Sequence, residues 1–81
     1  TNLRSLAVAY PNPVRDVLTV DPDGKQHVRF RLFDVEGRVL YQSVSNSGEP
    51  KEIPMQGYRK GVYLLRMDNG ESVQTKKIIR K

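Results

Sequence analysis

The chain has 81 residues, of which 37% are hydrophobic and 28% charged, with no cysteine and a net charge of +5. This is the composition of one small globular domain whose core is too modest to support a deep substrate cleft. The missing cysteines exclude disulfides, thiolate metal sites and cysteine nucleophiles. No apolar stretch approaches the ~20 residues of a membrane span, and no charged, apolar leader opens the sequence.

The first predicted strands are short and are separated by residues typical of turns. Leu6, Val8 and Tyr10 alternate with smaller residues, and the Pro-Asn-Pro of residues 11–13 ends that strand. A β-branched run over 17–20 predicts a second strand, which the Asp and Gly residues of 21–24 close. The first few residues, 1–5, are interpreted as the end of a linker.

The clearest strand covers residues 28–33. Val28, Phe30 and Leu32 point to one face, whereas His27, Arg29 and Arg31 point to the other. The Asp-Val-Glu-Gly of residues 34–37 is typical of a tight turn in which the Asp bonds the backbone and the Gly takes a positive φ. Residues 39–44 then return as the partner strand of a hairpin.

Three more strands are expected in the second half of the chain. Ile53 and Met55 alternate around a proline, which indicates an edge strand. Residues 62–67 form a strongly apolar strand, and Asn69-Gly70 predicts a hairpin into a last strand over 73–79. We expect Ile79 to share a core face with Val73.

These patterns predict an all-β fold and no helix. About seven strands with turn signals every 8–12 residues or so favour an immunoglobulin-like antiparallel β-sandwich. An OB-type or SH3-like barrel is the alternative. Tyr63 follows a loop at the start of the penultimate strand, where sandwich domains often place a tyrosine that bonds back to the preceding corner. We expect it in the core with Val28, Phe30, Leu32 and Leu65.

Chemistry-bearing residues are few. The single histidine, His27, lies on the polar face of a strand, so no catalytic Ser/His/Asp set is expected. Asp21 and Asp23 are two residues apart, as in a calcium loop, but they lack the downstream Glu of an EF-hand. Phe30 and Phe33 lie near arginines but face opposite sides of their strand, which disfavours a nucleic-acid stacking platform. We expect no cofactor, metal or nucleic acid.

Four motifs in order suggest a family. A Pro-Asn-Pro at 11–13, a Leu-Phe-Asp-Val-Glu-Gly-Arg at 32–38, a Gly-Val-Tyr-Leu-Leu at 61–65 and a basic-aliphatic tail at 76–81 resemble the type A C-terminal sorting domain of the type IX (Por) secretion system. The resemblance covers residues 8–81, and the whole chain is interpreted as one such domain. Its candidate sorting and recognition residues are Pro11, Asn12, Pro13, Asp34, Gly37, Arg38, Gly61, Tyr63, Lys76, Lys77, Ile78, Ile79, Arg80 and Lys81.

The resemblance implies a function without catalysis. Proteins with such a tail cross the inner membrane by a signal peptide, here expected outside this chain, and fold in the periplasm. The tail directs an N-terminal cargo, such as a gingipain-type protease, through an outer-membrane translocon. A surface sortase removes the tail, and the cargo is attached to the cell surface or released.

The basic charge and the last strand fit such a role. The last strand is expected to offer a free peptide edge and a cationic end to a receptor, although lysines also protect exposed edges. Arg80 and Lys81 are expected to be exposed charges that folding does not need. The stiff segment at 11–13 also favours exchange of the N-terminal strand, residues 3–10, between two isolated copies.

Two other functions remain open from the residues alone. The chain is compatible with an immunoglobulin-like accessory or adhesion module, for which Tyr41 and Tyr58 are the candidate carbohydrate-binding aromatics. A fragment of an enzyme is the third reading.

Overall fold

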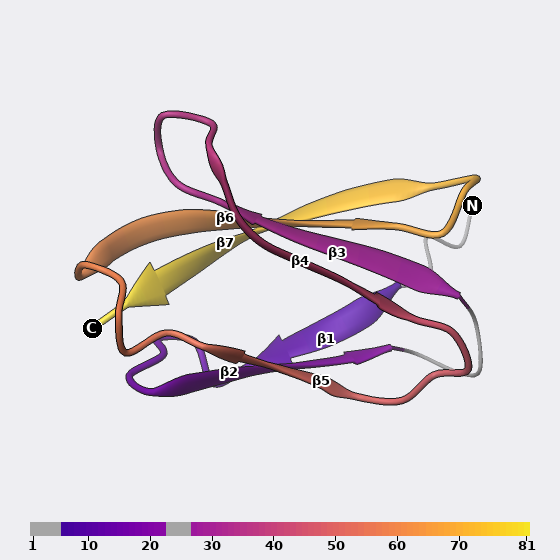
Figure 1. The fold of residues 1–81 in the computed structure, drawn as a ribbon, viewed down its shortest axis with the longest axis horizontal. Coiled ribbons are helices and arrows are strands. Elements are labelled where there is room, and N and C mark those ends of the chain that lie inside the picture. The colour runs from indigo at the N-terminus through magenta and orange to yellow at the C-terminus, as the bar shows by residue number, and fades with distance from the viewer. Residues whose placement is uncertain (1–5, 23–26) are drawn as a thin grey trace.

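The computed structural model describes residues 6–22 and 27–81 and folds them into a sandwich of two antiparallel sheets (Figure 1). One sheet has the strand order β1-β2-β5 and the other β4-β3-β6-β7. No helix able to span a membrane occurs in the described part of the chain. The strands are β1 (Ala7–Tyr10), β2 (Val17–Pro22), β3 (Val28–Phe33), β4 (Val39–Ser45), β5 (Lys51–Pro54), β6 (Gly61–Asp68) and β7 (Val73–Arg80).

This strand order confirms the predicted immunoglobulin-like sandwich. Sequential strands pair as hairpins in β1–β2, β3–β4 and β6–β7, while β5 crosses back to β2 and β6 crosses back to β3. The seven-stranded constant-type immunoglobulin sandwich places its third, sixth and seventh strands together in one sheet, as here, but its fourth strand in the other sheet. In this chain β4 instead pairs with β3. β5 is an edge strand, as expected from the proline at its end.

The core lies between the two sheets and contains the residues that the alternation predicted. In β3 the buried side chains are Val28, Phe30 and Leu32, and in β6 they are Tyr63, Leu65 and Met67. The facing sheet contributes Ala7, Leu18, Val20 and Ile53, and the loops add Leu6, Val14 and Met55. The alternation along β1 identifies a strand, but its buried residue is Ala7, while Val8 and Tyr10 are both 49% exposed.

The last strand corrects one sequence prediction. Ile78, not Ile79, packs into the core, because β7 pairs with β6 in the register that places Ile78 opposite the buried Tyr63. Ile79 does share a face with Val73, but that face is the outer one, and the two side chains are 39% and 50% exposed. A register shift of one residue would exchange the two faces of the strand.

The remaining boundaries differ only slightly from the predicted ones. β2 continues through Asp21 to Pro22, while Asp23 and Gly24 of the predicted turn lie outside the described residues. Residues 3–5 of the predicted first strand also lie outside them. The hairpin at Asn69-Gly70 is confirmed, with Gly70 at a φ of 93°.

The antiparallel order gathers the loops at two opposite ends of a molecule whose longest extent is 34 Å (Figure 1). One end holds residues 11–16, 34–38 and 55–60 and the C-terminal Lys81, and we call it the motif end. The other end holds the start of β1 and the β4–β5 and β6–β7 connections. Segments from all four sequence motifs therefore meet at one end of the sandwich.

Candidate functional site

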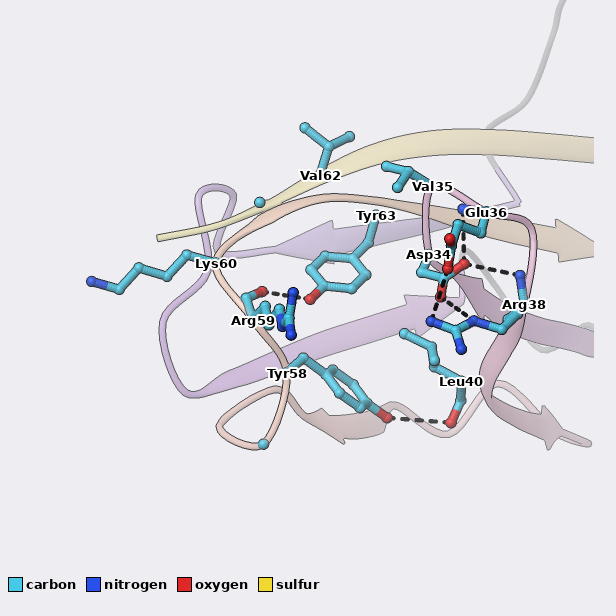
Figure 2. Close-up of a pocket in the computed structure, with 12 residues that line it drawn as sticks. Asp34, Val35, Glu36, Arg38, Leu40, Tyr58, Arg59, Lys60, Val62 and Tyr63 are labelled. Carbon is cyan, nitrogen blue, oxygen red and sulfur yellow. Dashed lines mark hydrogen bonds and ion pairs between the residues drawn. The ribbon is translucent and has the colours of Figure 1, made fainter.

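The motif end contains an open cleft of about 730 Å³ between the β3–β4 turn and the β5–β6 loop (Figure 2). Leu40, Tyr58 and Tyr63 contribute its apolar wall. Its rim is charged on both sides, and the residues that provide this charge are Asp34, Glu36, Arg38, Arg59 and Lys60. Mixed charge around an apolar wall provides binding chemistry for a polypeptide surface.

The β3–β4 turn is organised around Asp34, as predicted. Its Oδ1 accepts hydrogen bonds from the backbone N–H groups of Glu36 and Arg38, both at 2.9 Å. Its Oδ2 lies 2.8 Å from the Nε of Arg38, and the Nη2 of the same arginine lies 3.0 Å from the Oε1 of Glu36. The backbone N–H of Arg38, followed by the Arg38 side chain and the N–H of Glu36, lowers the pKa of Asp34. Gly37 has a φ of 88°, which confirms the predicted positive value.

The two partners of the ion pair between Asp34 and Arg38 differ in their exposure to solvent. The Asp34 side chain is 13% exposed, whereas that of Arg38 is 72% exposed and has its pKa raised by Asp34 and then Glu36. An exposed ion pair contributes at most about 1 kcal/mol to folding. The turn therefore uses Asp34 to fix its backbone and presents the cationic Arg38 to solvent.

Tyr63 forms the corner contact expected of an immunoglobulin-like sandwich. Its hydroxyl donates to the backbone carbonyl of Arg59, four residues upstream in the β5–β6 loop (Figure 2). The Tyr58 ring packs beside it with ring centroids 5.9 Å apart, and the Tyr58 hydroxyl lies 3.3 Å from the Leu40 carbonyl. Because Tyr58 and Tyr41 are both half-buried against the core, neither is the free aromatic platform that a carbohydrate module needs.

The Pro-Asn-Pro segment lies against the outer edge of β7. The side-chain amide of Asn12 donates to the carbonyl of Lys77 at 2.9 Å, and its Oδ1 accepts from the N–H of Ile79 at 3.0 Å. Val14 continues this contact, since its N–H donates to the Ile79 carbonyl and its carbonyl accepts from the N–H of Lys81, both at 2.8 Å. The first and last motifs are thus hydrogen-bonded to each other.

This contact corrects two expectations about the tail. The cationic end of β7 does not present a free peptide edge, because Asn12 and Val14 occupy it. Arg80 is not simply an exposed charge either: it is half-buried, and its Nε donates to the carbonyl of Met55 at 2.8 Å. Arg80 and Lys81 therefore take part in closing the motif end.

The other candidate residues lie apart from this site. His27 is exposed beside the start of β3, at the opposite end. Asp21 lies in β2, and no cluster of three metal-ligating side chains occurs among the residues that the structure describes, which omit Asp23. Phe30 is buried and Phe33 is half-buried on the outer face, so the two rings do face opposite sides.

The comparisons with known proteins agree with the arrangement of motifs. The model of the secretion system C-terminal sorting domain family matches residues 8–81. The chain belongs to this family. As a sorting domain it is the C-terminal part of a larger secreted protein, which the type IX secretion system recognises and delivers to the cell surface or the medium.

One relative shows where such a domain occurs. Over 74 residues the sorting domain is 32% identical to the endo-acting ulvan lyase of Formosa agariphila. The matched segment covers 89% of this chain and 14% of the lyase. The similarity is therefore confined to a small part of the lyase and describes the sorting domain rather than the cargo.

Several contacts of the sorting domain had no signal in the sequence. The hydrogen bond from Arg80 to Met55 joins residues 25 positions apart, and those from Asn12 join residues 65 and 67 positions apart. The basic-aliphatic run at 76–81 indicates the end of a strand but not its neighbours. The one hint in the sequence that the Pro-Asn-Pro motif and the tail contact each other is that both belong to the same ordered set of motifs.

Proposed function

We propose that the secretion apparatus recognises this sorting domain at its motif end, while the cargo extends from the opposite end. The observation that carries the proposal is the convergence of all four motifs at the end of the sandwich remote from the start of β1 (Figure 1). Because the longest extent of the domain is 34 Å, a cargo joined before Ala7 leaves the motif end accessible.

Within the motif end, the proposed residues divide into two groups. The first group maintains the shape: Asp34 and Gly37 fix the turn, Tyr63 fixes the corner and Asn12 holds the tail. The second group faces the partner and is charged. It consists of the exposed or half-buried side chains of Arg38, Lys60, Lys77, Arg80 and Lys81.

The remaining family residues support the same division. Gly61 begins β6 with a φ of 144°, a conformation that side chains rarely adopt, and Ile78 anchors the tail in the core. Pro11 and Pro13 flank Asn12 and are exposed. Lys76 is half-buried and Ile79 is exposed on the outer face. In this proposal these residues position the charged group at the motif end.

The proposed partners are the outer-membrane translocon and a surface sortase. The sorting domain folds in the periplasm, directs its covalently attached cargo through the translocon and is then removed, which leaves the cargo attached to the surface or released. This order of events rests on the family to which the chain belongs. The cargo itself is proposed to be a larger secreted protein such as a hydrolase, and the sorting domain performs no catalysis in this scheme.

The test uses charge reversals that leave the contacts of the fold in place. Residues 1–81 are fused behind a folded reporter in a bacterium with a type IX system, alone or with Lys60→Glu plus Lys81→Glu. Lys81 is suited to this purpose because its contact to Val14 is made by its backbone. Lys51→Glu, at the start of β5 and the opposite end, is the control for a charge reversal away from the motif end.

We expect the double reversal to retain the reporter in the periplasm while the control exports it as the parent does. Thermal melting of each purified domain confirms equal folding. Equal export by all three chains would refute recognition at the motif end. Failure of the unmodified chain to export would refute the sorting role of this chain.

A further inference from the structure

The outer face of the β4-β3-β6-β7 sheet carries apolar side chains where an antiparallel sandwich usually carries polar ones. Leu64 is 40% exposed and lies opposite Phe33 on one side and Lys77 on the other. The register continues the row, since Val39 lies opposite Phe33. The next outward-facing pair along β6 and β7 is Val62 and Ile79. We call these five residues the outer row: Val39, Phe33, Leu64, Val62 and Ile79.

Next to the outer row lies a pair of like charges. Arg31 of β3 and Arg66 of β6 are direct cross-strand partners. Two like charges in this position destabilise a sheet. The Nε of Arg31 is buried and has no hydrogen-bond partner within residues 6–22 and 27–81. Neither arginine has an ion-pair partner among the described residues.

The charge of the outer face is predominantly positive. Arg29, Arg31, Arg66 and Lys77 lie on it, and Asp68, opposite Arg29, is the acidic residue among its strand positions. The planar guanidinium of arginine binds carboxylates through two parallel hydrogen bonds. An anionic group seated over Arg31 and Arg66 would relieve their repulsion.

We propose that this outer face is a second docking surface of the sorting domain, for a polypeptide segment of the secretion apparatus that presents a carboxylate beside aliphatic side chains. The carboxylate binds Arg31 and Arg66, and the aliphatic groups pack on the outer row. Naming the secretion apparatus as the source rests on the proposed function. The outer face is distinct from the cleft, because Val62 is the only residue of the outer row that also lines the cleft.

A protein fits this surface better than a membrane or a nucleic acid. The cations lie in the strand positions of one sheet with a mainly aliphatic row beside them. Single-stranded nucleic acids stack on successive aromatic rings, and Phe33 is the one aromatic side chain among the described residues of this row. Apolar surface next to arginines is the composition that protein interfaces favour. The apolar row and the arginine pair therefore point to a partner segment with one or more Asp or Glu residues next to Val, Leu or Ile.

The test uses Arg66→Glu in the reporter fusion of residues 1–81. The introduced carboxylate lies opposite Arg31 and forms a favourable cross-strand pair, so the variant should melt at or above the parental temperature. Export should fall about tenfold, the loss expected when one charge-assisted hydrogen-bonded pair is removed from an interface. Lys51→Glu is the control with the same change of charge on the other sheet.

A photo-crosslinking side chain at position 64 identifies the partner in exporting cells, with position 52 on the other sheet as the control site. A crosslink from position 64 to a protein of the secretion apparatus, lost with Arg66→Glu, supports the proposal. Crosslinks to the cargo, to lipid or to a second copy of the domain overturn it, as does parental export of Arg66→Glu or the absence of any crosslink. If the unmodified fusion is not exported, the proposed function fails instead.

Discussion

Replacement of Asn12 by alanine tests whether the Pro-Asn-Pro motif holds the C-terminal tail. The change removes the two hydrogen bonds from the Asn12 side chain to the backbone of Lys77 and Ile79, at 2.9 and 3.0 Å. A typical hydrogen bond contributes about 0.5–1.5 kcal/mol net, and these two are exposed, so Asn12→Ala should lower the free energy of unfolding by about 1–2 kcal/mol. For a domain of this size each 1 kcal/mol corresponds to about 4–8 °C in Tm.

Urea denaturation and amide hydrogen exchange measure this effect together. The N–H of Ile79, which donates to Asn12, should exchange faster in Asn12→Ala, while that of Leu65 in the core strand should change only with the global stability. Asn12→Asp is the matched control. It keeps an acceptor for Ile79 but turns an oxygen toward the carbonyl of Lys77, so it should destabilise the domain while it preserves protection at Ile79.

The result that would refute this reasoning is specific. If Asn12→Ala stayed within the ~0.5 kcal/mol of ordinary surface substitutions, and exchange at Ile79 were unchanged, the motif would not hold the tail. The contact would then be incidental to folding.

Two further predictions concern single hydrogen-bonded groups. Tyr63→Phe removes the hydroxyl that donates to the carbonyl of Arg59, and urea denaturation should show a free energy of unfolding lower by about 0.5–1.5 kcal/mol. The control Tyr10→Phe, at a residue that is 49% exposed, should change it very little. Equal effects of the two changes would contradict the corner contact. The hydroxyl of Ser45, followed by the N–H of Ser47, lowers the pKa of Glu49 from 4.5 to about 2. Since the ionised form is favoured in the folded state, this contribution is present above about pH 4.5 and is lost as the pH falls toward 2. The difference in unfolding free energy between the parent and Glu49→Gln should shrink over that range, and a difference independent of pH would contradict the assignment.

The fold was largely predictable because its strongest signals are local. The alternation of Val28, Phe30 and Leu32 sets the inner face of β3, and the turn around Asp34 follows from residues four positions apart at most. Tyr63 was placed in the core and at a corner by its position at the start of a strand after a loop. Patterns of period 2 and short turn motifs carry enough information for these elements.

The arrangement of the tail was not predictable in the same way. Two adjacent isoleucines lie near the end of the last strand, and alternation alone does not decide which one is inside. Pairing of Ile78 with Tyr63 in the neighbouring strand decides it. The repulsive pair of Arg31 and Arg66 also exists only through the register of two strands that are far apart in the sequence. Long-range pairing leaves no mark in a local pattern.

The tail therefore combines a structural and a recognition role that a simple truncation does not separate. A chain cut after Ile79 loses the cations of Arg80 and Lys81, but it also loses the bond from Arg80 to Met55 and the backbone bond from Lys81 to Val14. Reduced export of such a chain would follow from a loosened motif end as readily as from missing charge. Lys81→Glu keeps the backbone bond and reverses the charge, whereas Asn12→Ala keeps every charge and removes a structural contact. A recognition role for the cationic end requires the first change, at unaltered thermal stability, to reduce export more than the second.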